Sequence, residues 1–273
     1  MEAFLQFFEN LSTLQKIVWI FGSLAFTWLL EFGAPLVQLN YTNKWKHGLK
    51  NLAFLATSVI INTLFGILTV GIFIWLGKNN FGLLNWIDLN LWVELVIAVM
   101  ALDFFAQWIA HYSLHKFSWL WKFHLVHHSD TAVDATTGTR LHPGDFLVRE
   151  VFALLAIIAF GIPFGFYMFY RITTILITYF VHANIHLPLW LDKGISLILI
   201  SPNMHKFHHH FERPWTDSNF GSIFSIWDRI FGTFVYDDPS KIIYGVDVID
   251  ESKSEDLAYQ FRLPWDKSIK TDY

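Results

Sequence analysis

The sequence predicts an all-α integral membrane protein: a helical bundle of about three spans plus a helical hairpin that dips into the membrane, with a histidine-rich cap in the cytosol. Two observations carry this prediction. Of the 273 residues, 54% are hydrophobic and only 15% are charged, whereas soluble globular proteins carry about 25% charged residues. All but one of the 13 histidines fall between His111 and His210, in regular spacings. The composition places the chain in lipid, and the histidine-rich stretch is the feature that points to its function.

Three apolar runs in the first part of the chain are long enough to span a membrane as helices, which takes about 20 residues. They are Leu14–Leu30, Leu52–Leu76 and Leu91–Ala110. We expect residues 1–94 to form an N-terminal transmembrane region. Asp103 lies within the third run, and an ionisable group inside a span is costly and marks a functional site. The alternative is that Asp103 lies near a helix end and simply reaches water.

The next apolar stretch, residues 148–181, behaves differently because Gly161-Ile-Pro163-Phe-Gly165 interrupts it. The interruption leaves pieces of about 13 and 17 residues, and the first covers only about 20 Å as a helix, against a hydrocarbon core of roughly 30 Å. A hairpin that dips into the membrane and returns to its starting side fits this pattern better than two full spans.

Lysines in the short loops predict the orientation. Lys44, Lys46 and Lys50 lie between the first two runs, whereas Lys78 is alone between the second and the third. Because short cytoplasmic loops carry the excess of Lys and Arg, we expect the whole histidine-rich region on the cytoplasmic face. Residues 237–273 are polar and acidic and are expected to form a soluble C-terminal tail. The chain lacks the basic face that nucleic-acid binding requires.

The histidines form three motifs, His111-x-x-x-His115, His124-x-x-His127-His128 and His205-x-x-His208-His209, with His142, His182 and His186 between them. On a helix, residues three or four apart share a face, while adjacent residues point about 100° apart. Each H-x-x-H-H motif can therefore present imidazoles to two neighbouring metal ions. About ten such ligands suit two ions and exceed what one tetrahedral zinc can use. A histidine that stands apart, such as His47, is more often a satisfied polar group.

The absence of several known motifs limits the classes of metal site and enzyme to which the chain can belong. The chain has no cysteine, which excludes thiolate metal sites and a thiol nucleophile. It also has no H-E-x-x-H, no Glu-x-x-His and no G-x-S-x-G, the motifs of zinc proteases, ferritin-like di-iron proteins and serine hydrolases. A histidine site beside an apolar hairpin favours oxidation of an unactivated C–H bond of a lipid, which needs a redox metal and O2. The alternatives are a zinc-dependent membrane hydrolase and a metal transport or storage protein.

Residues 95–236 resemble the fatty acid hydroxylase/sterol desaturase superfamily of integral-membrane di-iron oxygenases. The resemblance rests on the three histidine motifs and on Arg140-x-His142-Pro143, His182-Ala-Asn184-Ile, Pro202-x-Met204-His205, Thr216-Asp217-Ser-Asn219-Phe-Gly221 and Trp227-Asp228-Arg229-Ile-Phe231-Gly232-Thr233. It implies an oxygenase domain over residues 95–236 with two iron ions, O2 as co-substrate and a lipid substrate. It also implies a separate electron donor, such as a reductase with cytochrome b5 or a ferredoxin.

The resemblance further implies ten iron ligands: His111, His115, His124, His127, His128, His142, His182, His205, His208 and His209. His186 is the reserve ligand, because some branches of the superfamily use its position instead of that of His142. His210 is expected behind the ligands or at the surface, and Asp145 stands where relatives commonly carry Glu. Ligating imidazoles usually donate their second N–H to an acceptor, and the candidates for that role are Asp103, Asp130, Asn184, Asp217, Asn219 and Asp228.

The sequence leaves open whether the reaction is hydroxylation or desaturation and whether the lipid is sterol-like, fatty acyl or alkyl. The C-terminal residues carry no lumenal or dilysine retrieval signal. This favours a bacterial inner membrane over the endoplasmic reticulum.

Overall fold

The computed structural model describes residues 2–213 and 215–270, so the last three residues of the predicted tail lie outside the described residues. The described part is helical and contains no β-strand, only isolated β-bridges. Its long helices are α2 (Thr13–Gly33), α3 (Lys44–Asn79), α5 (Leu91–Leu102), α7 (Ser118–His128), α8 (Pro143–Phe160) and α9 (Phe164–His182). The shorter ones are α1 (Glu2–Glu9), α4 (Leu83–Trp86), α6 (Ala110–Lys116), α10 (Leu189–Ile195), α11 (Pro202–His208), α12 (Ile226–Ile230) and α13 (Leu257–Arg262).

Four helical stretches are long and apolar enough to cross a membrane: Thr13–Gly33, Lys44–Trp86, Leu91–Lys116 and Phe164–His182. The three spans predicted from the sequence lie within the first three of them. Large apolar side chains stand exposed along these helices, among them Ile67 with 79% of its surface accessible. Exposed apolar surface of this extent is typical of contact with lipid. The prediction of an all-α integral membrane protein is confirmed.

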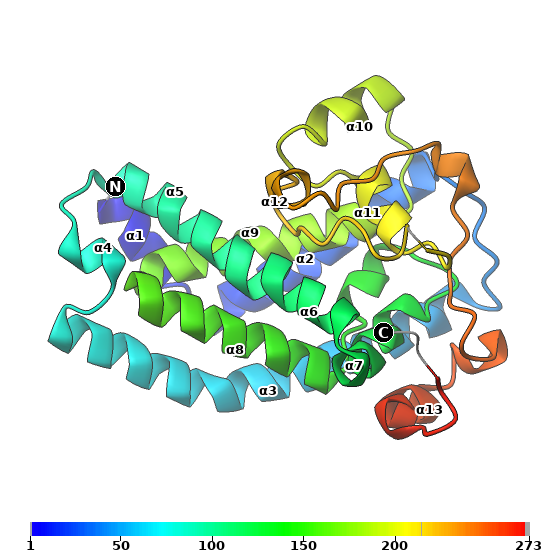
Figure 1. Cartoon of the computed structure of the whole chain (residues 1–273), viewed down its shortest axis with the longest axis horizontal. Helices are drawn as coiled ribbons and strands as arrows, with labels where there is room; N and C mark the ends of the chain where they lie inside the picture. The colour runs from blue at the N-terminus through cyan, green and yellow to red at the C-terminus, as the bar shows by residue number, and fades with distance from the viewer. Residues whose placement is uncertain (1, 214, 271–273) are drawn as a thin grey trace.

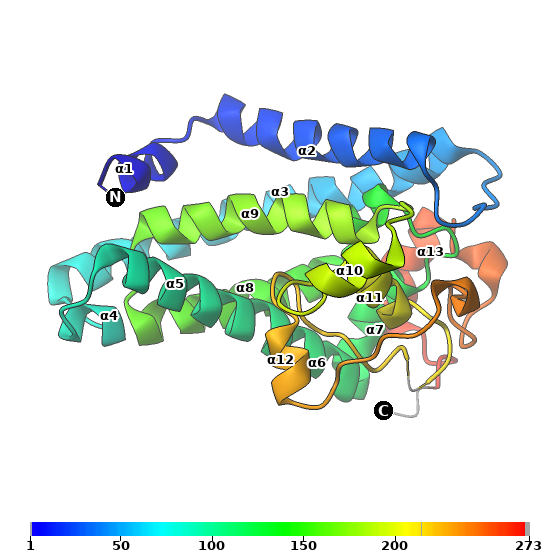
Figure 2. The ribbon, with the colours of Figure 1, turned by 90° about the horizontal axis from the view of Figure 1, so that it is seen from above.

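Five long helices, α2, α3, α5, α8 and α9, run side by side along one axis. In Figure 1, α1 and α4 lie at one end of the bundle, and α6, α7, α11 and α13 gather at the other end. Figure 2 shows α9 between α2 and α5, and the chain contacts agree with this arrangement. We call the end that holds α6, α7, α11 and α13 the cap.

The predicted hairpin is formed by α8 and α9, which turn at Gly161 with a φ of 65°. An added Cβ there would lie 2.5 Å from a backbone carbonyl oxygen, so this close turn requires glycine. The two helices have 18 and 19 residues and are longer than predicted. The difference arises because α8 begins at Pro143, in a polar first turn where the Arg149 Nε donates to the Asp145 carboxylate at 2.8 Å. This ion pair stabilises a charged first turn. The turn extends α8 beyond the apolar run on which the prediction of its length was based.

A π-helical segment, Asp103–Ile109, joins α5 to α6. Such segments accommodate an extra residue within a helix and are frequent at functional sites. Asp103 is fully buried, and its carboxylate accepts hydrogen bonds from the backbone N–H groups of Ile223 at 3.0 Å and Phe224 at 3.2 Å. Asp103 therefore does not reach water, and it ties the loop before α12 to the third span.

The C-terminal tail packs against the cap. Leu263 and Ile269 are buried in one apolar cluster with Val126 of α7. Arg140, also buried, donates from Nε to the Val126 carbonyl at 2.8 Å and from Nη2 to the carbonyl of Ser254 in the tail. The tail thus covers the outer face of the helix that carries the first H-x-x-H-H motif.

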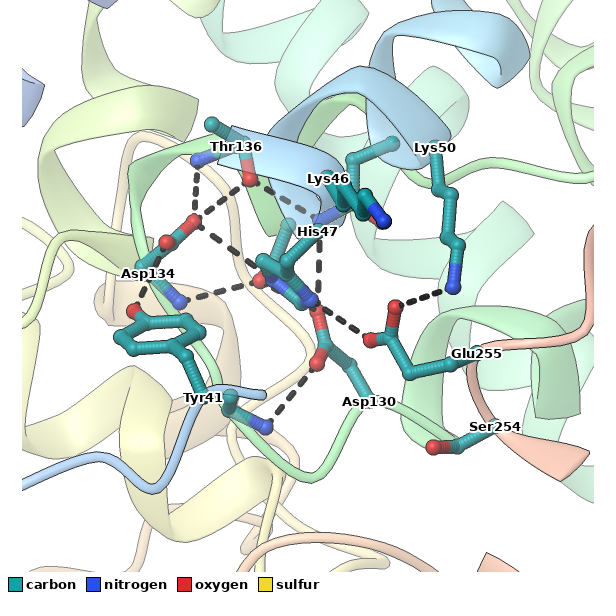
Figure 3. Close-up of polar contacts among 12 residues, drawn as sticks. Tyr41, Lys46, His47, Lys50, Asp130, Asp134, Thr136, Ser254 and Glu255 are labelled. Atoms are coloured by element: carbon teal, nitrogen blue, oxygen red, sulfur yellow. Dashed lines mark hydrogen bonds and ion pairs between the residues drawn. The ribbon is translucent and has the colours of Figure 1, made fainter. Parts of the chain in front are cut away.

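An ionic cluster fastens the tail to the start of α3 (Figure 3). Glu255 lies 2.7 Å from the His47 Nδ1 and 2.9 Å from the Lys50 Nζ. The other ring nitrogen of His47 lies 3.5 Å from an Asp130 carboxylate oxygen and 3.1 Å from the Asn51 amide nitrogen. Both ring nitrogens of His47 are thus engaged within the protein, as expected of a satisfied polar group.

Replacing Glu255 by Gln is expected to loosen the tail. The hydrogen bond with His47, and then Lys50, lowers the pKa of Glu255 to about 2. Because this folded-state pKa lies below the unfolded value of about 4.3, the stabilisation is complete above that pH and is lost as the pH falls toward 2. At pH 7 we expect α13 amides to exchange about fivefold faster in E255Q, corresponding to ~1 kcal/mol for a half-exposed charged hydrogen bond.

The matched control is E251Q, since Glu251 is exposed on the same segment. The ratio of E255Q to wild-type exchange rates should shrink toward one as the pH falls through the stated window. Equal protection of α13 in E255Q and wild type at pH 7 would contradict this role for Glu255.

Candidate metal centre

The cap brings nine buried histidines into two adjacent groups. The five-histidine group consists of His111, His115, His124, His128 and His208, and the four-histidine group of His127, His182, His205 and His209. Within each group, one ring nitrogen from every member lies within 4.8 Å of the others. Four segments meet here: α6, α7, the end of α9, and α11 with the residue after it.

Helical geometry divides each H-x-x-H-H motif between the groups. On α7, His124 and His128 are four residues apart and belong to the five-histidine group, while His127 points to the other. In the second motif His205 and His209 share the four-histidine group, and His208 joins the first. Each motif therefore contributes to both groups, because residues four apart share a helix face and neighbours do not.

Backbone carbonyls orient three of the rings. The Nδ1–H groups of His111, His182 and His208 donate to the carbonyl oxygens of Phe220 (2.9 Å), Thr178 (2.6 Å) and Ser218 (2.7 Å). A carbonyl can only accept, so Nδ1 carries the proton in these three rings and Nε2 presents a lone pair. This is the tautomer that a metal-ligating histidine needs.

Two carboxylates do the same for other members of the five-histidine group. The Nδ1 of His124 lies 2.5 Å from Asp145, and the Nδ1 of His115 lies 3.2 Å from Asp217. Arg149 donates to the same Asp145 carboxylate and holds it in place. A carboxylate behind the ring fixes its orientation and raises the basicity of the ligand nitrogen.

The facing nitrogens show that the residues suit a cation. The Nε2 atoms of His111 and His124 lie 2.8 Å apart although both rings carry their proton on Nδ1. Two lone pairs at this distance repel each other unless a positive ion lies against them. In the four-histidine group, the His182 Nε2 lies 2.9 Å from the His205 Nε2, and neither ring nitrogen of buried His209 has a hydrogen-bond partner in the described part of the chain. A bound metal ion would remove both anomalies.

Burial favours the neutral, metal-binding form of these rings. Desolvation, with neighbouring imidazoles adding to it, lowers the pKa of the six histidines of the two groups that lie outside the spanning helices: His124, His127, His128, His205, His208 and His209. A ligand nitrogen must be unprotonated, so no proton has to be displaced near neutral pH.

Three other histidines of the stretch lie outside the two groups. His142, one of the ten predicted ligands, caps α8: its Nδ1 accepts from the Gly144 N–H at 3.0 Å, and its Nε2 lies 3.3 Å from the Phe261 carbonyl oxygen. His186, the reserve, is exposed. His210 is buried and accepts from the backbone N–H of Ile243 at 3.0 Å, which joins it to the C-terminal tail. The structure thus brings nine of the ten predicted ligands together and leaves His142 apart.

Of the six residues proposed to hydrogen-bond the ligand rings, only Asp217 does so in the described structure. Asp228 acts on a ligand ring indirectly. Its carboxylate accepts a hydrogen bond from the backbone N–H of Phe220 at 2.8 Å, and the carbonyl of Phe220 in turn orients His111. The remaining four, Asp103, Asp130, Asn184 and Asn219, brace loops and helix ends around the cap. Asp145 was not among the residues predicted to hydrogen-bond a ligand ring. The sequence feature that could have identified it is its position three residues after His142, where relatives commonly carry Glu.

A cavity of about 430 Å³ leads from the membrane helices to both histidine groups. Most of its lining comes from α2, α3, α8 and α9, and it includes His111 of one group and His127, His182 and His205 of the other. A long, thin molecule in this cavity would reach both groups at once.

Nine buried histidines in two adjacent groups, at one end of a bundle of membrane-spanning helices, define a class of membrane protein with a histidine-rich site that could bind metal ions. Residues 95–233 match the fatty acid hydroxylase family, and the chain belongs to that family. It is similar to alkylglycerol monooxygenases of Homo sapiens (29% identity over 181 residues, 66% of this chain and 38% of the relative) and Danio rerio (30% over 182 residues, 66% and 38%). It is also similar to the ornithine lipid hydroxylase OlsE of Rhizobium tropici (26% over 139 residues, 51% and 41%). The chain spans less than half the length of these relatives. No solved structure is significantly similar to it.

Proposed function

We propose that this protein is a membrane di-iron oxygenase that uses O2 and external electrons to hydroxylate a C–H bond of a lipid. The observation that carries the proposal is the pair of histidine groups that border one cavity. Membership of the fatty acid hydroxylase family supports a lipid substrate and hydroxylation rather than desaturation. The similar proteins, named as monooxygenases and a lipid hydroxylase, support the same choice.

One iron would be held by the five-histidine group and the other by the four-histidine group. Imidazole also suits zinc and copper, so iron is chosen for the reaction that the family name describes. When bound, the two irons would supply the electron transfer to O2. The reaction balances as one lipid C–H, one O2, two electrons and two protons giving one hydroxylated lipid and one water.

The protein's own residues hold the ligands and place the substrate. The carbonyls of Phe220, Thr178 and Ser218 keep three ligand rings in one tautomer, and Asp145 does so for His124. Preorganised rings need no rearrangement during the reaction, which is how a rigid site lowers the barrier. The cavity walls keep a lipid chain beside the histidines and exclude bulk water.

We propose that the site faces the cytoplasm and takes its electrons from a separate donor, such as a reductase with cytochrome b5 or a ferredoxin. The lysines near the cap-side start of α3, Lys44, Lys46 and Lys50, support this orientation. We favour a bacterial inner membrane over the endoplasmic reticulum as its location.

The test is metal content and O2 consumption of the purified full chain. We expect about two irons per chain, and O2 consumption that requires both a reductant and a total lipid extract. Lipids of cells that carry the protein should gain one oxygen atom relative to cells that lack it. A protein loaded only with zinc that turns over a lipid without O2 would overturn the proposal in favour of a hydrolase.

A further inference from the structure

The cavity contains a charged cluster far from the histidines. Arg171 lies in the middle of α9, one of the potential spans, and lines the cavity. Its Nη1 donates to the carboxylate of Glu150 on α8, and its Nη2 donates to the Asn62 side-chain oxygen on α3 at 3.3 Å. Glu150 is only 2% exposed. Ionisable groups at this depth are rare, usually paired, and mark the path of a substrate or an ion.

A second cation borders the same part of the cavity. Lys16, near the start of α2, is among the lining residues, and its side chain has no hydrogen-bond or ion-pair partner among the residues that the structure describes. One turn further along α2, the Trp19 indole nitrogen donates to the carbonyl of Ile172 at 2.8 Å, which fixes this part of α2 beside Arg171.

The charges of this region do not balance. The charged side chains that line the cavity, apart from the histidines, are Lys16, Arg149, Arg171 and Glu150. Arg149 is already neutralised by Asp145 at 2.8 Å. Lys16 and Arg171 therefore stand against Glu150 alone, which leaves an excess of one positive charge along the cavity. A cleft that carries a net charge raises the local concentration of ligands of the opposite charge.

The position of the cluster also limits which part of a substrate can bind there. Arg171 precedes His182 by eleven residues on one continuous helix, which corresponds to about 16 Å. A polar group held at Arg171 cannot touch the histidines itself. The rest of an extended molecule would run along α9 and bring a carbon of its chain to them.

We infer that Lys16, Arg171 and Glu150 form a binding site for the anionic headgroup of the lipid substrate, with the hydrocarbon chain extended along α9 toward the histidines. Arg recognises carboxylate and phosphate alike through its fork of N–H donors, and the shared chemistry is a single-chain lipid with a terminal anion. The inference rests on the proposed function in that the bound lipid is the molecule to be oxidised. It differs from it in that headgroup binding needs neither iron nor O2.

The experiment measures binding of three probes with the same chain to the full-length protein: palmitate, hexadecyl phosphate and the neutral hexadecanol. We expect at least one of the two anions to bind the wild type about tenfold more tightly than the alcohol. The anion that is preferred identifies the headgroup as a carboxylate or a phosphate. Equal affinity for all three probes would overturn the inference, whatever the iron content or O2 consumption of the same preparation.

Variants assign the preference to the named residues. R171Q should lower anion affinity to that of the alcohol and leave the affinity for hexadecanol unchanged. K16Q, which removes the partly exposed second cation, should lower anion affinity severalfold. E150Q should act in the opposite direction and tighten anion binding, because it removes the only carboxylate of the cluster. K78Q is the matched control, since Lys78 is exposed at the far end of α3. Anion preference that survives both R171Q and K16Q would contradict the site.

If the anion preference is present and responds to these variants, but the purified protein neither holds iron nor consumes O2, the headgroup site stands and the proposed function falls. If iron and O2 consumption are found without anion preference, the reverse holds.

Discussion

Replacing His128 or His209 by alanine is expected to reduce the bound iron from about two ions per chain to about one and to lower turnover more than about 100-fold. Each variant removes one member of a different group, so each should empty one site and leave the other filled. Metal analysis of the purified variants, together with O2 consumption, measures both effects. Retention of two irons by both variants would refute the ligand assignment.

The matched control for these variants is H186A. His186 lies in the same histidine-rich stretch but is exposed and outside both groups. It should keep both irons and wild-type turnover. Loss of both ions in H128A and H209A alike would show that the two groups assemble as one interdependent site rather than as two separate ones.

Replacing Asp145 by Asn is expected to weaken iron binding by about 10–100-fold without unfolding the protein. The amide can occupy the same space, but it lacks the negative charge that faces the His124 Nδ1 at 2.5 Å and Arg149 at 2.8 Å. Chelator titration of the iron-loaded protein reports the affinity, and thermal unfolding reports the fold.

Two further variants show whether Asp145 acts through His124. D145E keeps the charge and should recover most of the affinity. D217N should have a smaller effect than D145N, because Asp217 lies further from its histidine, at 3.2 Å, and is partly exposed. Chelator resistance of D145N equal to that of the wild type would contradict the positioning role.

The histidine motifs could be predicted from sequence because their geometry is local. The spacing within His124-x-x-His127-His128 determines which faces of a helix the rings occupy, and the structure divides them accordingly. Contacts between residues on different helices could not be predicted in this way. Asp145 contacts His124 only because the start of α8 packs beside α7, and no helical period connects the two residues. The carbonyls of Phe220, Thr178 and Ser218 cannot be recognised from sequence at all, since every residue has one.

The start of α8 and the packing of the tail also depend on contacts that the sequence pattern does not reveal. An apolar run was expected to begin at Val148, but charge pairing between Asp145 and Arg149 carries the helix back to Pro143. The polar composition after residue 237 indicated a soluble tail, yet scattered apolar residues such as Leu263 and Ile269 are sufficient to pack against α7. Such sparse contacts leave no periodic pattern to read.

The π-helical segment Asp103–Ile109 sets the rotational phase of everything that follows it on the third span. One residue more or less turns the rest of a helix by about 100°. Deleting a single residue from this segment would bring Tyr112 and Lys116 to the positions of His111 and His115 and turn both imidazoles away from the five-histidine group. The number of residues between Asp103 and His111 is therefore fixed by the site. A change that preserves every histidine can still separate the histidines of the proposed metal centre.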